Sequence, residues 1–106
     1  LLQLPASSTF KRVAKEIDLL NQRDDVTGIM LHLPLPKRIN PTEMQARIEP
    51  PKDVEGVSPA NIGFVVYGRT LIAPCTARAA LELIEAAGVK LEGAEACVVG
   101  ALTWKR

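Results

Sequence analysis

The most informative segment of the sequence is GIMLHLPLP, residues 28–36. Its first six residues are almost continuously apolar, which is typical of a short β-strand that is covered on both faces. Pro34 and Pro36 then interrupt the segment, since a proline has no amide hydrogen to donate to a neighbouring strand. The sequence therefore predicts a buried strand over residues 28–33 that ends abruptly at Pro34.

Two helices are expected on either side of this strand. Before it, apolar residues recur at spacings of three and four over residues 10–20, and Ser7 or Ser8 can cap the helix. After it, the sequence Asn-Pro-Thr-Glu at residues 40–43 combines a cap residue, a proline at the first helical position and an early glutamate. This combination predicts a short helix that runs through Ile48.

The second half of the chain begins with an expected ordered loop, Glu49 to Asn61, which contains three prolines and a glycine. Farther on, Thr76 can cap a helix that extends to about Ala87, and Gly88 is well placed to end it. The side of this helix that we expect to be buried consists of Ala80, Leu81, Ile84 and Ala87.

A second apolar run lies near the end of the sequence. Residues 96–99, Ala-Cys-Val-Val, are followed by Gly100, as in the first strand and turn of a dinucleotide-binding unit. Helices thus alternate with short apolar runs along the chain. This order predicts an α/β fold with a mostly parallel sheet.

Composition excludes several classes of protein. The chain has 106 residues, of which 47% are apolar and 24% charged, and no apolar run approaches the length of a membrane span. Its 13 basic and 12 acidic residues give a net charge of +1 without a basic stripe, so we expect no nucleic-acid partner. Cys75 and Cys97 lie too far apart for a local metal motif or a disulfide framework. The simplest setting is reducing and intracellular.

Both ends of the sequence suggest a piece of a longer protein. The chain starts with Leu-Leu-Gln-Leu-Pro rather than methionine, without the features of a signal peptide. It stops soon after an expected strand, where an α/β domain normally continues into a helix.

Five motifs occur in the order and at the distances of one enzyme family. LHLPLP at residues 31–36 is similar to Q-L-P-L-P, and PKDVEG at residues 51–56 is similar to P-x-K-D-V-D-G. PANIG at residues 59–63 resembles P-x-N-x-G, PCT at residues 74–76 resembles P-C-T-P, and residues 88–100 resemble the linker to V-V-G-R-S. The chain thus resembles the bifunctional methylenetetrahydrofolate dehydrogenase/cyclohydrolases.

This resemblance implies an activity and a fold. The family oxidises 5,10-methylenetetrahydrofolate with NAD(P) and hydrolyses the methenyl product to 10-formyltetrahydrofolate, both in one cleft. The implied fold has two α/β domains, so we expect residues 1–73 to be the later part of a three-layer, parallel-sheet folate domain. Residues 74–95 would be the interdomain helix and linker, and residues 96–106 the start of a Rossmann-type domain. NADP or NAD, a tetrahydrofolate substrate, a homodimer and a cytoplasmic or mitochondrial location are implied too.

The resemblance also assigns substrate-binding residues. His32 replaces the glutamine that contacts folate, Leu33 and Pro34 are further substrate-binding residues, and Glu55 replaces an aspartate that binds the pterin edge. Pro34, Leu35 and Pro36 would form the wall of the cleft. The extra methylene of Glu55 moves its carboxylate by roughly 1.5 Å. Simpler interpretations remain open: a histidine satisfied by backbone or water, prolines that merely end a strand, and a solvated loop carboxylate.

Thr76 and Gly100 are the expected cofactor-binding residues, although Thr76 is equally explained as a helix cap. Lys52 and Asp53 are expected to form an exposed ion pair that shapes the loop. The family's catalytic lysine and tyrosine lie on an earlier helix that this sequence lacks, and Ala101 and Leu102 replace a phosphate-binding arginine and serine. We expect no catalytic residue here and no metal site.

Three functions therefore remain. The first is part of a folate-dependent dehydrogenase/cyclohydrolase that is inactive in isolation. The second is a noncatalytic folate-binding or structural remnant. The third, which the folate motifs disfavour, is a nucleotide-binding domain of another oxidoreductase.

Overall fold

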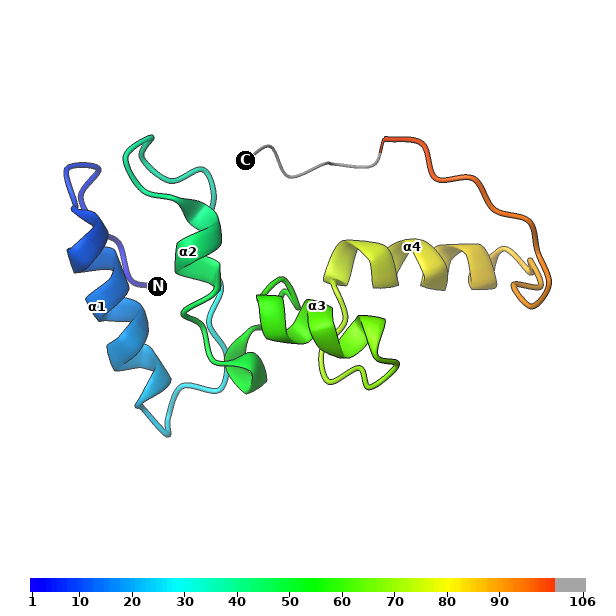
Figure 1. Cartoon of the computed structure of the whole chain (residues 1–106), viewed down its shortest axis with the longest axis horizontal. Coiled ribbons are helices and arrows are strands. Elements are labelled where there is room, and N and C mark those ends of the chain that lie inside the picture. Colours follow the sequence, from blue (N-terminus) through cyan, green and yellow to red (C-terminus); the bar gives the residue numbers. More distant parts are fainter. Residues whose placement is uncertain (101–106) are drawn as a thin grey trace.

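The computed structural model describes residues 1–100 of the chain. Its helices, in order, are α1 (Phe10–Asn21), α2 (Pro41–Gln45), the 3-10 helix η1 (Pro50–Lys52), α3 (Pro59–Val66) and α4 (Cys75–Ala86). Figure 1 shows α1 and α2 side by side at one end of the molecule, with α3 and α4 toward the other end. The molecule is elongated, measuring 48 × 32 × 25 Å along its principal axes.

Helix α1 follows the predicted amphipathic pattern, but its cap differs from the expectation. Val13, Ala14 and Ile17 are buried on one side of the helix. The N-cap is Thr9, whose side-chain oxygen accepts a hydrogen bond from the Arg12 amide. Ser7 and Ser8 lie too early in the chain, because a cap must stand directly before the first helical residue.

Helix α2 confirms the predicted start. The side-chain oxygen of Asn40 accepts from the Thr42 amide at 3.0 Å, and the Asn40 side chain donates to Glu43 at 3.1 Å. Pro41 occupies the first helical position, where a proline has no hydrogen bond to lose. The helix ends at Gln45, and turns continue the chain toward Ile48.

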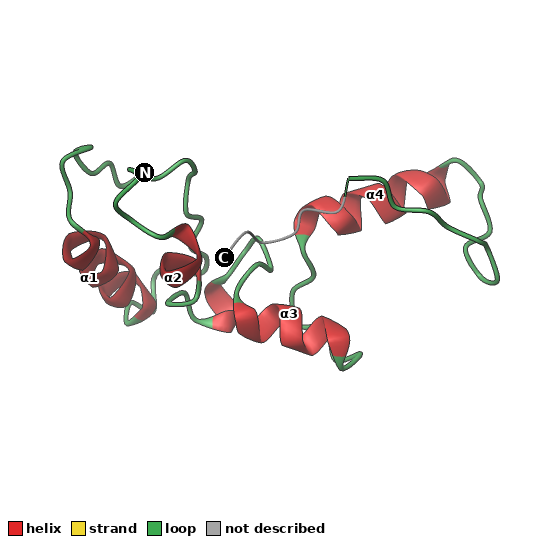
Figure 2. Cartoon of the chain, turned by 45° about the horizontal axis from the view of Figure 1, so that its top comes forward, coloured by secondary structure: helices red, strands yellow, loops and turns green. Residues whose placement is uncertain are grey.

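The prediction of a strand over residues 28–33 is wrong. Within the described residues no regular strand forms there, and Figure 2 draws none. What remains is one parallel bridge between Ile29 and Asp53, in which the Ile29 amide donates to the Lys52 carbonyl at 2.7 Å. A strand needs a continuous neighbour to pair with. Beyond this bridge no second extended segment accompanies residues 30–33, and Pro34 has no amide hydrogen to extend a ladder.

A single small core holds these elements together. Seven apolar residues are buried: Val13, Ala14, Ile17, Ile29, Ile39, Met44 and Ile48. They come from α1, α2 and the segments that flank them. The predicted loop Glu49–Asn61 is ordered, as expected, but it also contains η1 and the first turn of α3.

Helix α3 was not anticipated, although its start carries a clear signal. The Ser58 side chain accepts from the Asn61 amide at 3.3 Å, and Pro59 occupies the first helical position. A serine followed by a proline is a usual way to begin a helix. The missed signal lay inside the segment interpreted as a loop.

Helix α4 forms close to its predicted range, yet two details are wrong. It begins at Cys75 after Pro74, with no side-chain cap, so Thr76 lies inside the first turn. None of its residues is buried, including Leu81 and Ile84. Among residues 1–100 nothing covers its apolar side, and burial of a helix face requires a packing partner. Gly88 ends the helix with a φ of 77°, as expected.

The second predicted strand is also wrong within the described residues. Residues 96–99 form no regular element, and Val98 and Val99 are exposed, because no neighbouring strand lies beside them. Ala101 and Leu102 lie outside the described residues. No helix in residues 1–100 is long and apolar enough to cross a membrane.

Candidate functional site

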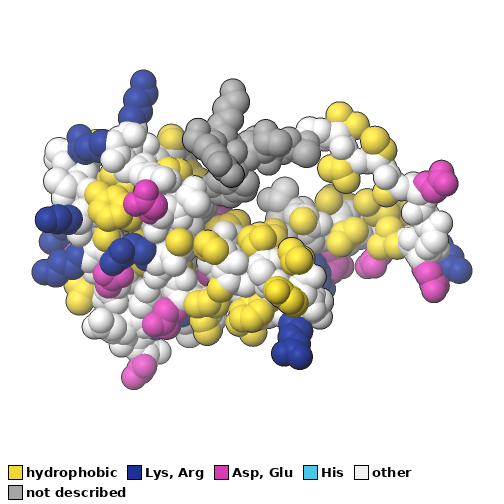
Figure 3. All heavy atoms as spheres, in the orientation of Figure 1, with side chains coloured by type: hydrophobic (Ala, Val, Ile, Leu, Met, Phe, Trp, Pro, Cys, Tyr) yellow, Lys and Arg dark blue, Asp and Glu magenta, His cyan; other side chains and the backbone are white. Residues whose placement is uncertain are grey.

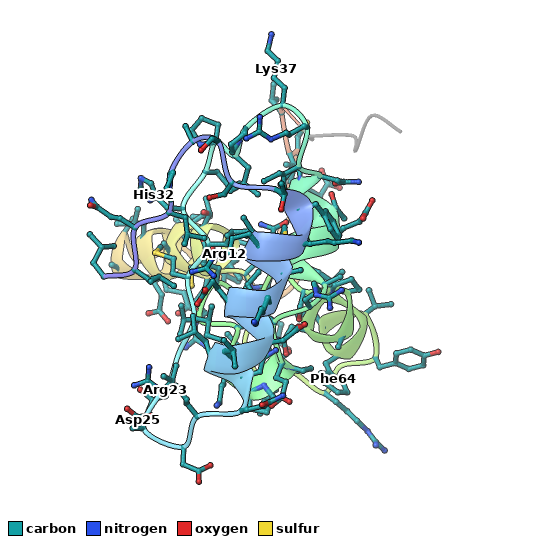
Figure 4. All side chains as sticks on the ribbon, turned by 90° about the vertical axis from the view of Figure 1, so that its left-hand side faces the viewer. Arg12, Arg23, Asp25, His32, Lys37 and Phe64 are labelled. Atoms are coloured by element: carbon teal, nitrogen blue, oxygen red, sulfur yellow. The ribbon has the colours of Figure 1, made fainter. Side chains whose placement is uncertain are left out.

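The segment 30–36 borders an open cleft. The cleft has a volume of about 1030 Å³, and its walls include Met30, His32, Pro34 and the N-terminal segment 1–6. His32 projects from the side of the molecule opposite Phe64 (Figure 4). The peptide bond between Leu33 and Pro34 is cis. His32 and Pro34 are therefore brought together at one surface, whereas Leu33 is exposed beside it without lining the cleft.

Lys52 does not form the expected ion pair with Asp53. Its ammonium group instead donates to three carbonyl oxygens at the end of α1: Leu20 at 3.3 Å, Asn21 at 2.5 Å and Arg23 at 2.8 Å. Cations are favourable at helix C-termini, where carbonyl groups lack intrahelical partners. The predicted loop-shaping role of Lys52 thus operates through α1, and a sequence motif could not identify these partners.

Asp53 points the other way and forms a buried polar cluster. Its side chain is 1% exposed, and Oδ2 accepts from the Ser58 amide at 2.7 Å and the Asn61 side chain at 3.0 Å. Burial alone would raise the pKa of Asp53, but the hydrogen bonds from Asn61 and Ser58 hold it below its ordinary value. The carboxylate is therefore charged at neutral pH.

Asn61 and Ser58 complete this cluster and were not predicted as site residues. Both are buried, at 0% and 1% exposure, and Asn61 also donates to the Pro50 carbonyl at 3.0 Å. The signal available in the sequence was PANIG at residues 59–63, which places an asparagine eight residues after Asp53. An asparagine buried in a short apolar helix needs a polar partner, and Asp53 is that partner.

Glu55 lies between this cluster and the start of α4. Its carbonyl oxygen accepts from the Cys75 amide at 3.2 Å, and the Cys75 thiol donates to the Val54 carbonyl at 3.1 Å. The next residue, Gly56, has a φ of 64°, and a Cβ there would lie 2.6 Å from the Ala73 carbonyl group. Only glycine fits so close an approach with a positive φ. Glu55 is half-buried and does not line the cleft beside His32.

The two expected cofactor residues are separate from these contacts. Thr76 is exposed in the first turn of α4. Gly100 is exposed too, with a φ of 94° and no atom within 4 Å of the position of a Cβ. Neither residue lines the cleft beside His32. Among residues 1–100 no group of three histidine, cysteine or acidic side chains could hold a metal ion.

The family scan finds a match over the first half of the chain. The model for the catalytic domain of tetrahydrofolate dehydrogenase/cyclohydrolase covers residues 1–55, which include the cleft segment, Lys52, Asp53 and Glu55. The match is to the same family that the five motifs resemble.

Curated relatives extend this similarity. The bifunctional protein FolD of Nitratiruptor is 38% identical over 99 residues, 93% of this chain and 35% of that protein. FolD 3 of Roseobacter denitrificans is 50% identical over 84 residues, 79% of this chain and 29% of that protein. The chain thus spans about a third of the length of these relatives.

Solved structures agree in fold. The bifunctional FolD of Campylobacter jejuni superposes with a TM-score of 0.76 at 32% identity, over 80% of this chain and 30% of that chain. The Trypanosoma brucei enzyme, solved with NADP cofactor and an inhibitor, gives a TM-score of 0.76 at 34% identity, over 83% and 30%. The described residues therefore adopt the conformation of part of an α/β folate enzyme.

Proposed function

The chain belongs to the tetrahydrofolate dehydrogenase/cyclohydrolase family, and from this membership we propose that it supplies the folate side of such an enzyme. The activity concerned is the NADP-dependent oxidation of 5,10-methylenetetrahydrofolate and the hydrolysis of the methenyl product to 10-formyltetrahydrofolate. The observation that supports it most directly is the family match over residues 1–55, which spans both His32 and Glu55.

The substrate-binding residues of this proposal are His32, Leu33, Pro34 and Glu55. His32 and Pro34 line an open cleft large enough for a pterin ring, and a histidine nitrogen can donate or accept a hydrogen bond there. Glu55 would accept from the amino and amide edge of the pterin, as paired acceptors do with planar donors. In the assembled enzyme this requires Glu55 to lie near the ring that His32 contacts.

The larger architecture is proposed on the same grounds. Residues 1–73 would join a parallel-sheet folate domain, residues 74–95 would bridge to the cofactor domain, and residues 96–106 would begin its Rossmann-type sheet. A homodimer acting in the cytoplasm is the state that we expect of the whole enzyme.

NADP would accept the hydride when it is bound to the whole enzyme. Within residues 1–100 its proposed contacts are Thr76 and Gly100, which are both exposed, so we expect most of the cofactor site to lie outside these residues. The contribution of this chain is therefore limited to binding and orienting the folate. The family's proton-transferring lysine has no counterpart in residues 1–106, so we expect the 106-residue chain to bind without turnover.

Calorimetric titration with 5-formyltetrahydrofolate, a stable reduced folate, tests the proposal. We expect submillimolar affinity in the 106-residue chain and a loss of about tenfold or more in His32→Ala and in Glu55→Ala, each of which removes a polar contact. Lys37→Ala and Glu95→Ala are matched controls, because both residues are exposed and neither is a proposed folate contact. Equal losses in the controls would contradict the assignment of these residues.

A noncatalytic structural remnant is the second candidate. It is favoured by the two departures from the family pattern, His32 for glutamine and Glu55 for aspartate. A well-folded chain that shows no affinity for 5-formyltetrahydrofolate would support this alternative.

A further inference from the structure

The main chain around Glu55 is fixed on both sides. Before it, the buried carboxylate of Asp53 is held by the Ser58 amide at 2.7 Å and the Asn61 side chain at 3.0 Å. After it, the Cys75 amide donates to the Glu55 carbonyl at 3.2 Å, and Gly56 lies against the main chain of Ala73. The loop therefore leaves the Glu55 main chain little freedom.

Asn61 is the centre of the first of these attachments. One side-chain nitrogen donates both to the Pro50 carbonyl and to the Asp53 carboxylate, each at 3.0 Å, so it ties together the two ends of η1. The Asn61 side chain is fully buried. It has no surface with which to touch a ligand, and any effect on binding must pass through another residue.

The departure at Glu55 makes this attachment more important. A glutamate has one more rotatable bond than the family's aspartate, so the side chain itself determines the direction of its carboxylate less well. Preorganisation of the surrounding main chain reduces the cost of ordering such a group when it binds.

We propose that Asn61 is a positioning residue that holds Asp53, and through it the Glu55 main chain, in the conformation that binds the pterin edge. The inference rests on the proposed function, since it assumes that Glu55 contacts a reduced folate. Asn61 acts on affinity only through Glu55, which separates this role from a general contribution to stability.

A double-mutant cycle tests the coupling. Affinity for 5-formyltetrahydrofolate is measured by calorimetry for the 106-residue chain, Asn61→Leu, Glu55→Ala and the double variant, at a temperature where circular dichroism shows all four folded. We expect each single variant to lose about tenfold, and the double variant to lose no more than Glu55→Ala alone. Losses that multiply, or an Asn61→Leu affinity equal to that of the wild type, overturn the inference.

A control and a second variant complete the design. Asn21→Leu removes another amide that ties the loop, through Arg47 at 2.7 Å and the Glu49 amide at 3.1 Å, but far from Glu55 along the chain. Its effect should multiply with that of Glu55→Ala. If Asn61→Leu does not fold, Asp53→Asn replaces it in the cycle with the same expected pattern.

The outcomes separate the two proposals. A wild-type chain that does not bind, or a Glu55→Ala variant with unchanged affinity, overturns the proposed role of Glu55 and the inference with it. Binding that depends on Glu55 but is not coupled to Asn61 or Asp53 overturns the inference alone.

Discussion

Residues 1–61 and residues 62–100 both contain amphipathic helices, but the two regions differ in whether side chains are buried. The first region contains every buried residue among residues 1–100, whereas the second contains none. Helices α1 and α4 both have 12 residues and an apolar side, yet only α1 has buried residues. Figure 3 shows apolar side chains gathered on the surface over α3 and α4, away from the basic residues around α1.

An amphipathic pattern therefore predicts a helix with a side that can be buried, but does not supply the surface against which that side packs. In residues 1–61 that surface lies within the chain, because Lys52, Asp53 and Asn61 bind the central loop to α1 and α3. For α4 no such surface lies within the described residues, and the chain spans about a third of its relatives' length.

The largest expected effect comes from removing a core side chain in the first region. Met44 is fully buried, so Met44→Ala should lower the free energy of unfolding by about 2–5 kcal/mol. Met30 is 65% exposed, so Met30→Ala should change it by less than about 0.5 kcal/mol. Urea denaturation of both variants gives the comparison, which fails if the two losses are equal.

Gly56 tests the contact between the two regions. Gly56→Ala adds a Cβ 2.6 Å from the Ala73 main chain at a φ of 64°, and should cost about 2–4 kcal/mol. Gly68 has a similar φ of 68° but open space around it, so Gly68→Ala should cost only about 1 kcal/mol. The difference in unfolding free energy isolates the close approach, and its absence would show that this approach does not constrain the loop.

Asp53 makes the stability of the first region depend on pH. Its folded pKa is lowered, so the unfolded chain takes up the proton at a higher pH than the folded chain. The stabilisation is therefore present above the ordinary value of 3.8 and is lost as the pH falls through the lowered pKa.

Asp53→Asn should cost about 1–3 kcal/mol at pH 7 and flatten the acid limb of the stability curve. Unfolding followed by circular dichroism between about pH 5 and pH 2 measures this limb. Asp24→Asn is the control, because Asp24 is exposed and its side chain makes no hydrogen bond or ion pair in the described structure. An acid limb that is unchanged in Asp53→Asn would contradict the charged cluster.

The smallest effect is expected on the apolar surface of the second region. Leu83 is 73% exposed, so Leu83→Ser should change the unfolding free energy by less than about 0.5 kcal/mol. It should nevertheless reduce self-association measured by analytical ultracentrifugation, since less apolar surface is exposed. A clear loss of stability would show that α4 is packed in the isolated chain, and would break the comparison.

The sequence predicted the family motifs and helices α1, α2 and α4. It did not predict all of the residues that contact one another around the site. Of the predicted substrate-binding residues, His32 and Pro34 border one cleft, whereas Leu33 and Glu55 do not line it. Asn61 was missed, since its role depends on a carboxylate eight residues earlier in the chain. The partners of Lys52 were missed for the same reason, because they lie about 30 residues away.

Helix starts, helix ends and short motifs could be predicted from the sequence alone, because they depend on residues that are neighbours in the chain. Asn40 and Pro41 specify the start of α2, Gly88 ends α4, and the ordered motifs identify the family. The apolar sides that are buried, and the limit of pairing to one bridge at Ile29, became known only from the tertiary structure. Caps and turns are satisfied within about four residues, whereas burial and strand pairing require surfaces from distant parts of the chain or from beyond it.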